Sequence, residues 1–136
     1  MLITVCTGKL HRVRVTAACL EYEGSITIDS TLMEAAGIVP FQLVHINSMA
    51  NAVHWETYAI PGKPGEGEIC LNGCPARLFQ PGDEVIILNL AHVTPEEAQG
   101  ISQRVVYVDQ RNGVKRVEVK TVHGGRVDCA ADVVRT

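Results

Sequence analysis

The stretch EYEGSITID, residues 21–29, places a Gly-Ser bond inside a run that otherwise has the composition of a β-strand. Glycine and serine also meet in ordinary turns, so the dipeptide alone decides nothing. The question is whether Gly24-Ser25 is a turn or a bond that the protein breaks by itself. The rest of the chain has to supply the answer.

The composition predicts one globular domain over residues 1–136. This length is common for single domains and long enough to bury a core. Hydrophobic residues make up 46% of the chain and charged residues 20%, which excludes a disordered protein. Aromatic residues are only 4%, so the core is expected to consist of Val, Ile, Leu and Ala.

The charge and hydropathy pattern limits which binding partners and which cellular location are expected. A net charge of −3 and a pI near 5.9 argue against a nucleic acid or an anionic membrane as partner. No apolar run reaches the roughly 18–20 residues of a membrane span. Residues 1–15 show no basic head followed by an apolar block, so a secretory signal is not expected. We therefore expect a cytoplasmic protein.

The five cysteines are an odd number, which favours reduced thiols that serve as small apolar residues. Cys70 and Cys74 lie close in sequence, and five histidines are available as further ligands. Zinc sites, however, combine cysteine or histidine pairs at characteristic spacings, and no second pair is present. The sequence therefore predicts no metal site.

Strand patterns dominate the chain. On a regular strand through residues 9–15, Lys9, His11 and Val13 would share one face. Two hairpins are predicted, over residues 40–60 and 104–119, and a loop is predicted over residues 61–68. Residues 68–78 predict a short strand that ends in an Asn-Gly turn. Residues 81–90 predict a strand that is buried on both faces. Residues 121–136 have too weak a periodicity for a prediction.

Two short helices are predicted from their capping residues. Residues 29–38 offer Asp29 or Ser30 as the N-cap, and Gly37 can end the helix in a left-handed conformation. Residues 94–100 carry Thr94 as a cap, followed by a proline and by a glutamate three positions after the cap. The whole pattern indicates one mainly β domain with two or three short helices.

Several motifs together resemble the aspartate 1-decarboxylase family. They are GKLHRVRVT (8–16), YEGSITID (22–29), AAGI (35–38), TYAI (57–60), an Asn-Gly pair after a strand, and GDEVII (82–87). The resemblance covers the chain up to about residue 98. It implies a double-psi β-barrel, a homotetramer with active sites between neighbouring subunits, and synthesis of β-alanine for pantothenate.

The resemblance also implies self-cleavage between Gly24 and Ser25. The serine hydroxyl would attack the preceding carbonyl carbon and convert the peptide into an ester, and β-elimination would then release residues 1–24 as the β chain. The α chain, residues 25–136, would carry a covalently bound pyruvoyl group derived from Ser25. Glycine suits this position because it has no side chain to hinder the attack. Thr57, helped by Asn72, would stabilise the oxyanion.

The implied cofactor is this pyruvoyl group alone, because a ketone at the chain terminus can accept the electrons left by decarboxylation. Tyr58 is the implied proton donor. The residues implied to bind the small amino-acid substrate are Lys9, His54, Thr57, Gly73, Cys74 and Pro75. His11 either helps to position the cleavage site or is a structural histidine, and Tyr22 and Tyr58 could also be core or interface residues. On a regular strand Thr57 and Tyr58 would point to opposite faces.

The chain departs from the family pattern in its substrate pocket. His54 stands where the family has an arginine, Asn47 where it has a tryptophan, and Cys74 and Pro75 where it has small residues. Histidine lacks arginine's permanent charge and its two-pronged grip on a carboxylate. Two alternatives to aspartate decarboxylation therefore stay open: decarboxylation of another amino acid, and a non-enzymatic barrel that binds but never cleaves. Whether cleavage needs a helper protein is also open.

Overall fold

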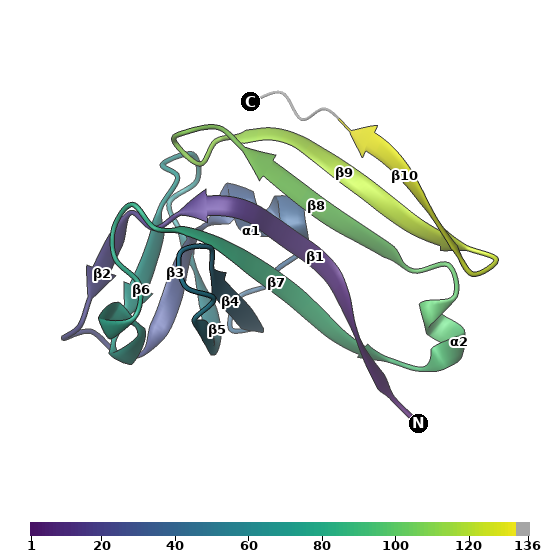
Figure 1. The fold of residues 1–136 in the computed structure, drawn as a ribbon, viewed down its shortest axis with the longest axis horizontal. Helices are drawn as coiled ribbons and strands as arrows, with labels where there is room; N and C mark the ends of the chain where they lie inside the picture. The colour runs from purple at the N-terminus through teal and green to yellow at the C-terminus, as the bar shows by residue number, and fades with distance from the viewer. Residues whose placement is uncertain (133–136) are drawn as a thin grey trace.

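A computed structural model describes residues 1–132, in which strands predominate (Figure 1). The strands are β1 (Ile3–Arg14), β2 (Ala17–Cys19), β3 (Ser25–Asp29), β4 (Leu43–Ser48), β5 (His54–Gly62), β6 (Ile69–Asn72), β7 (Glu84–Val93), β8 (Ser102–Val108), β9 (Val114–His123) and β10 (Arg126–Asp132). The helical segments are α1 (Ser30–Ala36), the 3₁₀ helix η1 (Cys74–Arg77) and α2 (Pro95–Ala98). The predicted content of two or three short helices is confirmed for the described part of the chain.

The strands pair in the order β10-β9-β8-β1-β7-β4-β5-β3-β6-β2. Three pairs are parallel, namely β1–β8, β2–β6 and β3–β5, and the remaining pairs are antiparallel. The chain therefore crosses over between strands that are distant in sequence, as it does in the double-psi β-barrel that the resemblance implies. Helix α1 packs against β1, β3 and β8 (Figure 1).

Both α-helices begin at the predicted caps. Asp29 accepts a hydrogen bond from the Thr31 amide at 2.8 Å, and Gly37 ends α1 with φ 77°. In α2, the Thr94 side chain accepts from the Glu97 amide while the Glu97 side chain accepts from the Thr94 amide. This is the reciprocal capping box that the spacing predicts.

The core forms around fully buried aliphatic side chains and one aromatic residue, Phe79. Two expectations about faces were wrong. Val13 is buried on the same side as Leu10, because a register shift between Leu10 and Val13, with Arg12 at φ 59°, interrupts the alternation of β1. Strand β7 is buried on one face only, since Ile86 and Leu88 are partly exposed.

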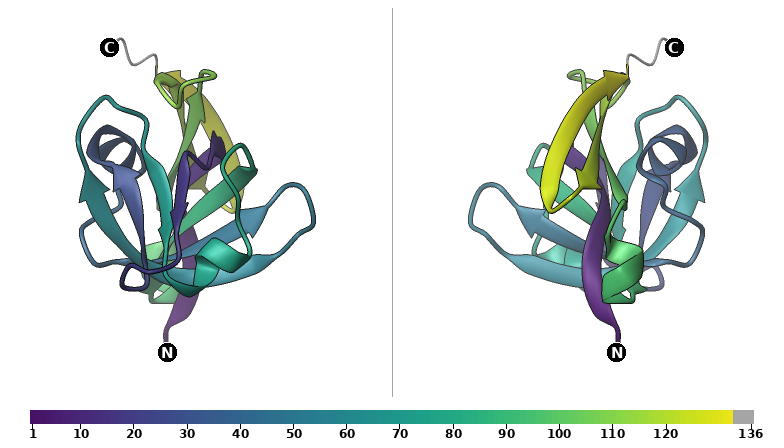
Figure 2. Two further views of the ribbon diagram at one scale, coloured as in Figure 1. Left: turned by 90° about the vertical axis from the view of Figure 1, so that its left-hand side faces the viewer. Right: turned by 90° about the vertical axis from the view of Figure 1, so that its right-hand side faces the viewer.

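Both predicted hairpins are confirmed. Strands β4 and β5 pair antiparallel, and their hairpin projects from the body of the molecule (Figure 2). Strands β8 and β9 pair around Asn112 and Gly113. The stretch for which no prediction was made contains the end of β9, a turn at Gly124-Gly125, and β10; residues 133–136 lie outside the described part.

The expected role of the cysteines holds for Cys70, which is buried. It is wrong for Cys19, Cys74 and Cys129, whose side chains are exposed. All five thiols are free, as expected. Among residues 1–132, no helix is long and apolar enough to cross a membrane.

Candidate active site

Ser25 is the first residue of β3 and is fully buried, whereas Gly24 before it is exposed. The Gly-Ser bond therefore lies where an exposed turn enters a buried strand. Ser25 pairs with Asn72 across the β3–β6 ladder, and its hydroxyl lies 3.5 Å from the Glu23 carbonyl oxygen. The bond is thus at the edge of the packed interior rather than in a free loop.

The Asn72 side chain holds the Ser25 hydroxyl. Its amide nitrogen donates to Ser25 Oγ and to Thr27 Oγ1, both at 3.0 Å. Its amide oxygen accepts from the Cys70 thiol at 3.3 Å. Because Asn72 is only 4% exposed, these bonds form in a region of low dielectric and fix the rotamer of Ser25.

Gly73 lets the backbone approach Gly24 closely. Its φ is 79°, in the left-handed region, and a Cβ built there would lie 2.9 Å from Gly24 Cα. The Gly73 amide donates to the Cys19 carbonyl at 2.8 Å. Only glycine fits both the conformation and the space. Cys74 and Pro75 follow in η1, the former exposed and the latter buried.

Thr57 and Tyr58 lie beside this site on β5. The parallel pairing of β3 with β5 begins with Ile26 and Ala59. Ser25 and Tyr58 each precede this pair by one residue, so they lie level with each other at the start of the ladder. Strand β5 pairs with β4 without a register shift, so Thr57 faces inward at 9% exposure and Tyr58 faces outward. The predicted opposite orientation of the two side chains is confirmed.

Within one chain, Lys9 lies on a strand that does not pair with the strand of Ser25. Strands β7, β4 and β5 separate β1 from β3 in the sheet, and the Lys9 side chain lies on the opposite face of β1 from buried Leu10. His11 shares the Lys9 face, where its ring contacts Tyr107 edge-on at 5.3 Å. Partial burial, followed by the nearby Lys9 and Arg12 charges, lowers the pKa of His11 below its ordinary value.

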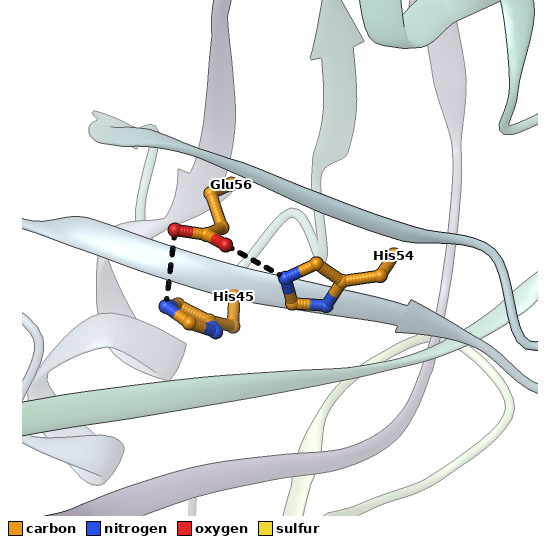
Figure 3. Close-up of side chains that lie close together, drawn as sticks. All are labelled: His45, His54 and Glu56. Atoms are coloured by element: carbon orange, nitrogen blue, oxygen red, sulfur yellow. Dashed lines mark hydrogen bonds and ion pairs between the residues drawn. The ribbon is translucent and has the colours of Figure 1, made fainter.

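His54 lies on the outer face of the β4–β5 hairpin rather than next to Ser25. Figure 3 shows its ring beside Glu56 and His45. His54 Nε2 lies 3.0 Å from Glu56 Oε2, and His45 Nε2 lies 3.4 Å from Glu56 Oε1. The hydrogen bond with His54, and then the charge of His45, lower the pKa of the Glu56 carboxyl. A carboxylate flanked by two imidazoles can bind a proton or a cation.

Sequence reasoning missed four members of these two clusters: Thr27, Cys70, His45 and Glu56. Alternation could have found Thr27, Cys70 and Glu56, because a residue two positions from a site residue shares its face of a strand. His45 joins Glu56 only through the pairing of β4 with β5. Thr27 follows Ser25 by two positions, and Glu56 follows His54 by two. Tyr22, which the sequence singled out, is 58% exposed in the turn before Gly24.

Comparison with known sequences gives one consistent result. The sequence model of a family described as aspartate decarboxylase matches residues 1–115. The aspartate 1-decarboxylase of Clostridium beijerinckii is 50% identical over 117 residues, which cover 86% of this chain and 94% of that protein. The enzymes of the same name from Lactiplantibacillus plantarum and Salinibacter ruber are 50% and 48% identical, over 91% and 88% of this chain and 95% and 82% of their own lengths.

Proposed function

The chain belongs to the aspartate decarboxylase family, and from this premise we propose that it converts L-aspartate to β-alanine and CO₂ for pantothenate synthesis. The relatives all carry the name of that activity and align with most of this chain. Neither alternative, another amino acid or a barrel that never cleaves, is favoured by these likenesses. The observation that carries the proposal is the buried Ser25 hydroxyl, held by Asn72 at the Gly24 bond.

The pyruvoyl group is proposed to come from Ser25. The residues around Ser25 fit such a group, because Gly73 leaves no side chain near Gly24 and Asn72 offers a buried amide donor. Ser25 Oγ would attack the Gly24 carbonyl carbon, the Gly24–Ser25 C–N bond would break, and an ester with a free amine would form. Elimination of the Gly24 carboxylate and hydrolysis with loss of ammonia would leave a ketone at the new terminus. The products are residues 1–24 and 25–136.

Two side chains of β5 are assigned roles in these steps. The inward hydroxyl of Thr57 would donate to the oxyanion formed on the Gly24 carbonyl, because it lies at the level of the Gly24-Ser25 bond in the β3–β5 ladder. The outward phenol of Tyr58 would return a proton to the substrate Cα after CO₂ leaves. When present, the pyruvoyl ketone supplies the electron sink that makes loss of CO₂ feasible.

We assign the complete active site to an interface between subunits of a homotetramer. Lys9, the proposed partner of a substrate carboxylate, lies on β1, which three intervening strands separate from the Ser25 strand in its own chain. A single chain also leaves several large apolar side chains exposed, among them Met1, Leu2, Val39, Phe41 and Leu43. A neighbouring copy could cover this surface and bring its own Lys9 to Ser25.

Intact mass spectrometry of the purified protein, combined with an assay for β-alanine release, tests the function. We expect two fragments that part between Gly24 and Ser25, the longer one capped by pyruvoyl, together with β-alanine formed from aspartate. A single 14.7 kDa species that stays whole and inactive would contradict the proposal, unless addition of cell extract restores cleavage through a maturation factor.

Mixing two inactive variants tests the interface. Lys9→Ala should mature but bind substrate poorly, and Ser25→Ala should retain Lys9 but form no pyruvoyl group. If the site joins two subunits, refolded mixtures should regain activity through sites that combine an intact Ser25 with an intact Lys9. No activity in the mixture would place the site within one chain.

A further inference from the structure

The outer face of the β4–β5 hairpin gathers three metal-ligand side chains: His45, His54 and Glu56 (Figure 3). His45 lies directly opposite Glu56 in the hairpin register, and His54 precedes Glu56 by two residues on the same face. One ligand atom from each side chain lies within 4.8 Å of the others. His45 and His54 are nine residues apart, and only the pairing of the two strands brings them together.

The two distances between a Glu56 oxygen and an imidazole nitrogen are close to those of a tetrahedral zinc site. Zinc–nitrogen and zinc–oxygen bonds of about 2.0–2.1 Å place neighbouring ligand atoms about 3.4 Å apart. Here the Glu56 oxygens lie 3.4 Å from His45 Nε2 and 3.0 Å from His54 Nε2. Two histidines and one glutamate are also a ligand set of zinc enzymes that keep the fourth position open.

Asn47 orients the His54 ring for metal binding. It is the register partner of His54 on β4, and its amide oxygen lies 2.7 Å from His54 Nδ1. An Nδ1–H that donates to this oxygen leaves the lone pair of Nε2 free for a metal, and Nε2 is the atom that faces Glu56. Metal-binding histidines almost always have such a partner for their second nitrogen.

We propose that His45, His54 and Glu56 bind a divalent transition-metal ion of the Zn²⁺ class, and that its open coordination position takes a carboxylate of the substrate. The second part rests on the proposed function. Glu56 and Tyr58 lie on the same face of β5, about 7 Å apart as alternate residues of a strand. A bound cation would supply there the positive charge that neutral histidine lacks.

Equilibrium dialysis of the purified protein against Zn²⁺, and against Co²⁺ as a spectroscopic probe, tests the ion site. We expect one ion per chain and a Co²⁺ spectrum without the charge-transfer band of thiolate ligands, which separates this site from the free cysteines. His54→Gln and Glu56→Gln should each lose this binding while keeping the thermal midpoint of the parent. Absence of binding, or binding that both variants retain, would overturn the proposal.

His123→Gln is the matched control. His123 Nε2 lies 4.0 Å from Asp128 Oδ2, so the pair offers an imidazole and a carboxylate but no second imidazole. Replacing His123 by glutamine should leave the number of ions bound per chain unchanged. An equal loss of binding in His123→Gln would mean that exposed histidines bind the ion without a built site, and would overturn the proposal.

The KM for aspartate tests the role of the ion. Removal of the ion by a chelator should raise KM about tenfold or more, and His54→Arg should abolish ion binding yet give a low KM that no longer responds to the chelator. An unchanged KM in the stripped protein would overturn the carboxylate role. A protein that binds the ion through these residues but releases no β-alanine, loaded or stripped, would overturn the proposed function and leave the ion site standing.

Discussion

The surroundings of Ser25 and the outer face of the β4–β5 hairpin differ in burial and in how fully their polar groups are paired within one chain. Ser25, Asn72 and Thr57 are all less than a tenth exposed, and every buried side-chain nitrogen or oxygen in residues 1–130 has a hydrogen-bond partner. His54 and Glu56, by contrast, are nearly half exposed and face solvent. From this difference we expect that a single chain can prepare the proposed cleavage, whereas substrate binding should depend on an ion or a neighbouring subunit at the outer face.

The largest effect that tests this comparison comes from Ser25→Ala. We expect complete loss of both cleavage and decarboxylation, because the nucleophile and the source of the ketone disappear together. His54→Gln should cleave at the parent rate and lose only affinity for aspartate. Mass spectrometry over time separates the two, and Ser102→Ala on β8 serves as an exposed control. A hairpin variant that fails to cleave would contradict the division between the two regions.

Asn72→Ala should have the next largest effect. Without its amide the Ser25 hydroxyl is free to change rotamer, and a displacement of about 1 Å can slow a reaction roughly a hundredfold. The buried Ser25 hydroxyl and the partly buried Thr27 hydroxyl also lose their donor, so the free energy of unfolding should fall by about 1–3 kcal/mol. Cleavage is followed by mass spectrometry and stability by urea unfolding.

Asn89→Ala is the matched control for that variant. Asn89 is similarly buried, at 3% exposed, but its amide donates to the carbonyls of Ala36 and Gly37 at the end of α1. We expect a comparable loss of stability and an unchanged rate of cleavage. If Asn89→Ala slowed cleavage as much as Asn72→Ala, the effect at Asn72 would be one of general stability.

A smaller effect is expected from Gly73→Ala. The new Cβ would lie 2.9 Å from Gly24 Cα, in a backbone conformation that alanine rarely adopts. Gly82→Ala shares the strain, with φ 95°, but has no atom within 4 Å of its Cβ. Strain should cost both variants about 1–2 kcal/mol, and only Gly73→Ala should also slow cleavage. Equal cleavage rates in the two variants would mean that the close packing of Gly73 against Gly24 does not contribute to cleavage.

Local patterns predicted the elements of the fold well because their causes are local. The caps at Asp29 and Thr94, the end of α1 at Gly37, and the hairpin turn at Asn112-Gly113 all depend on residues a few positions apart. The path of β1 was not predictable, since the bulge before Val13 is set by its pairing with β7. Alternation fails wherever a partner strand imposes an extra residue.

The two sites also differ in how far the sequence predicts them, because one depends on a contiguous motif and the other on the pairing of distant residues. The motif around Gly24 and Ser25 is contiguous, and the resemblance pointed to Asn72 and Gly73, which the β3–β6 pairing brings next to it. The resemblance groups Lys9 with the same site, but three strands separate its strand from that of Ser25 in the sheet. No spacing rule predicts a cluster such as His45 with Glu56, because a hairpin can join residues at any separation.

The smallest effect concerns the outer face of β1. Burial, then the charges of Lys9 and Arg12, lower the pKa of His11 below its ordinary value of 6.5. The unfolded chain therefore binds a proton at higher pH than the folded chain does. Folding stability from this group is fully present above about pH 6.5 and is lost as the pH falls through the window between the two pKa values.

Lys9→Met should raise the pKa of His11, because it removes the largest of the repulsive charges acting on the ring. An NMR titration of the imidazole measures the shift, and the pH dependence of the thermal midpoint should weaken with it. Lys63→Met, in the exposed loop after β5, removes the same charge from a position that does not act on His11 and should leave the titration unchanged. An unchanged His11 in Lys9→Met would mean that Lys9 does not share its face, and the assignment of Lys9 to the outer surface, away from Ser25, would fail.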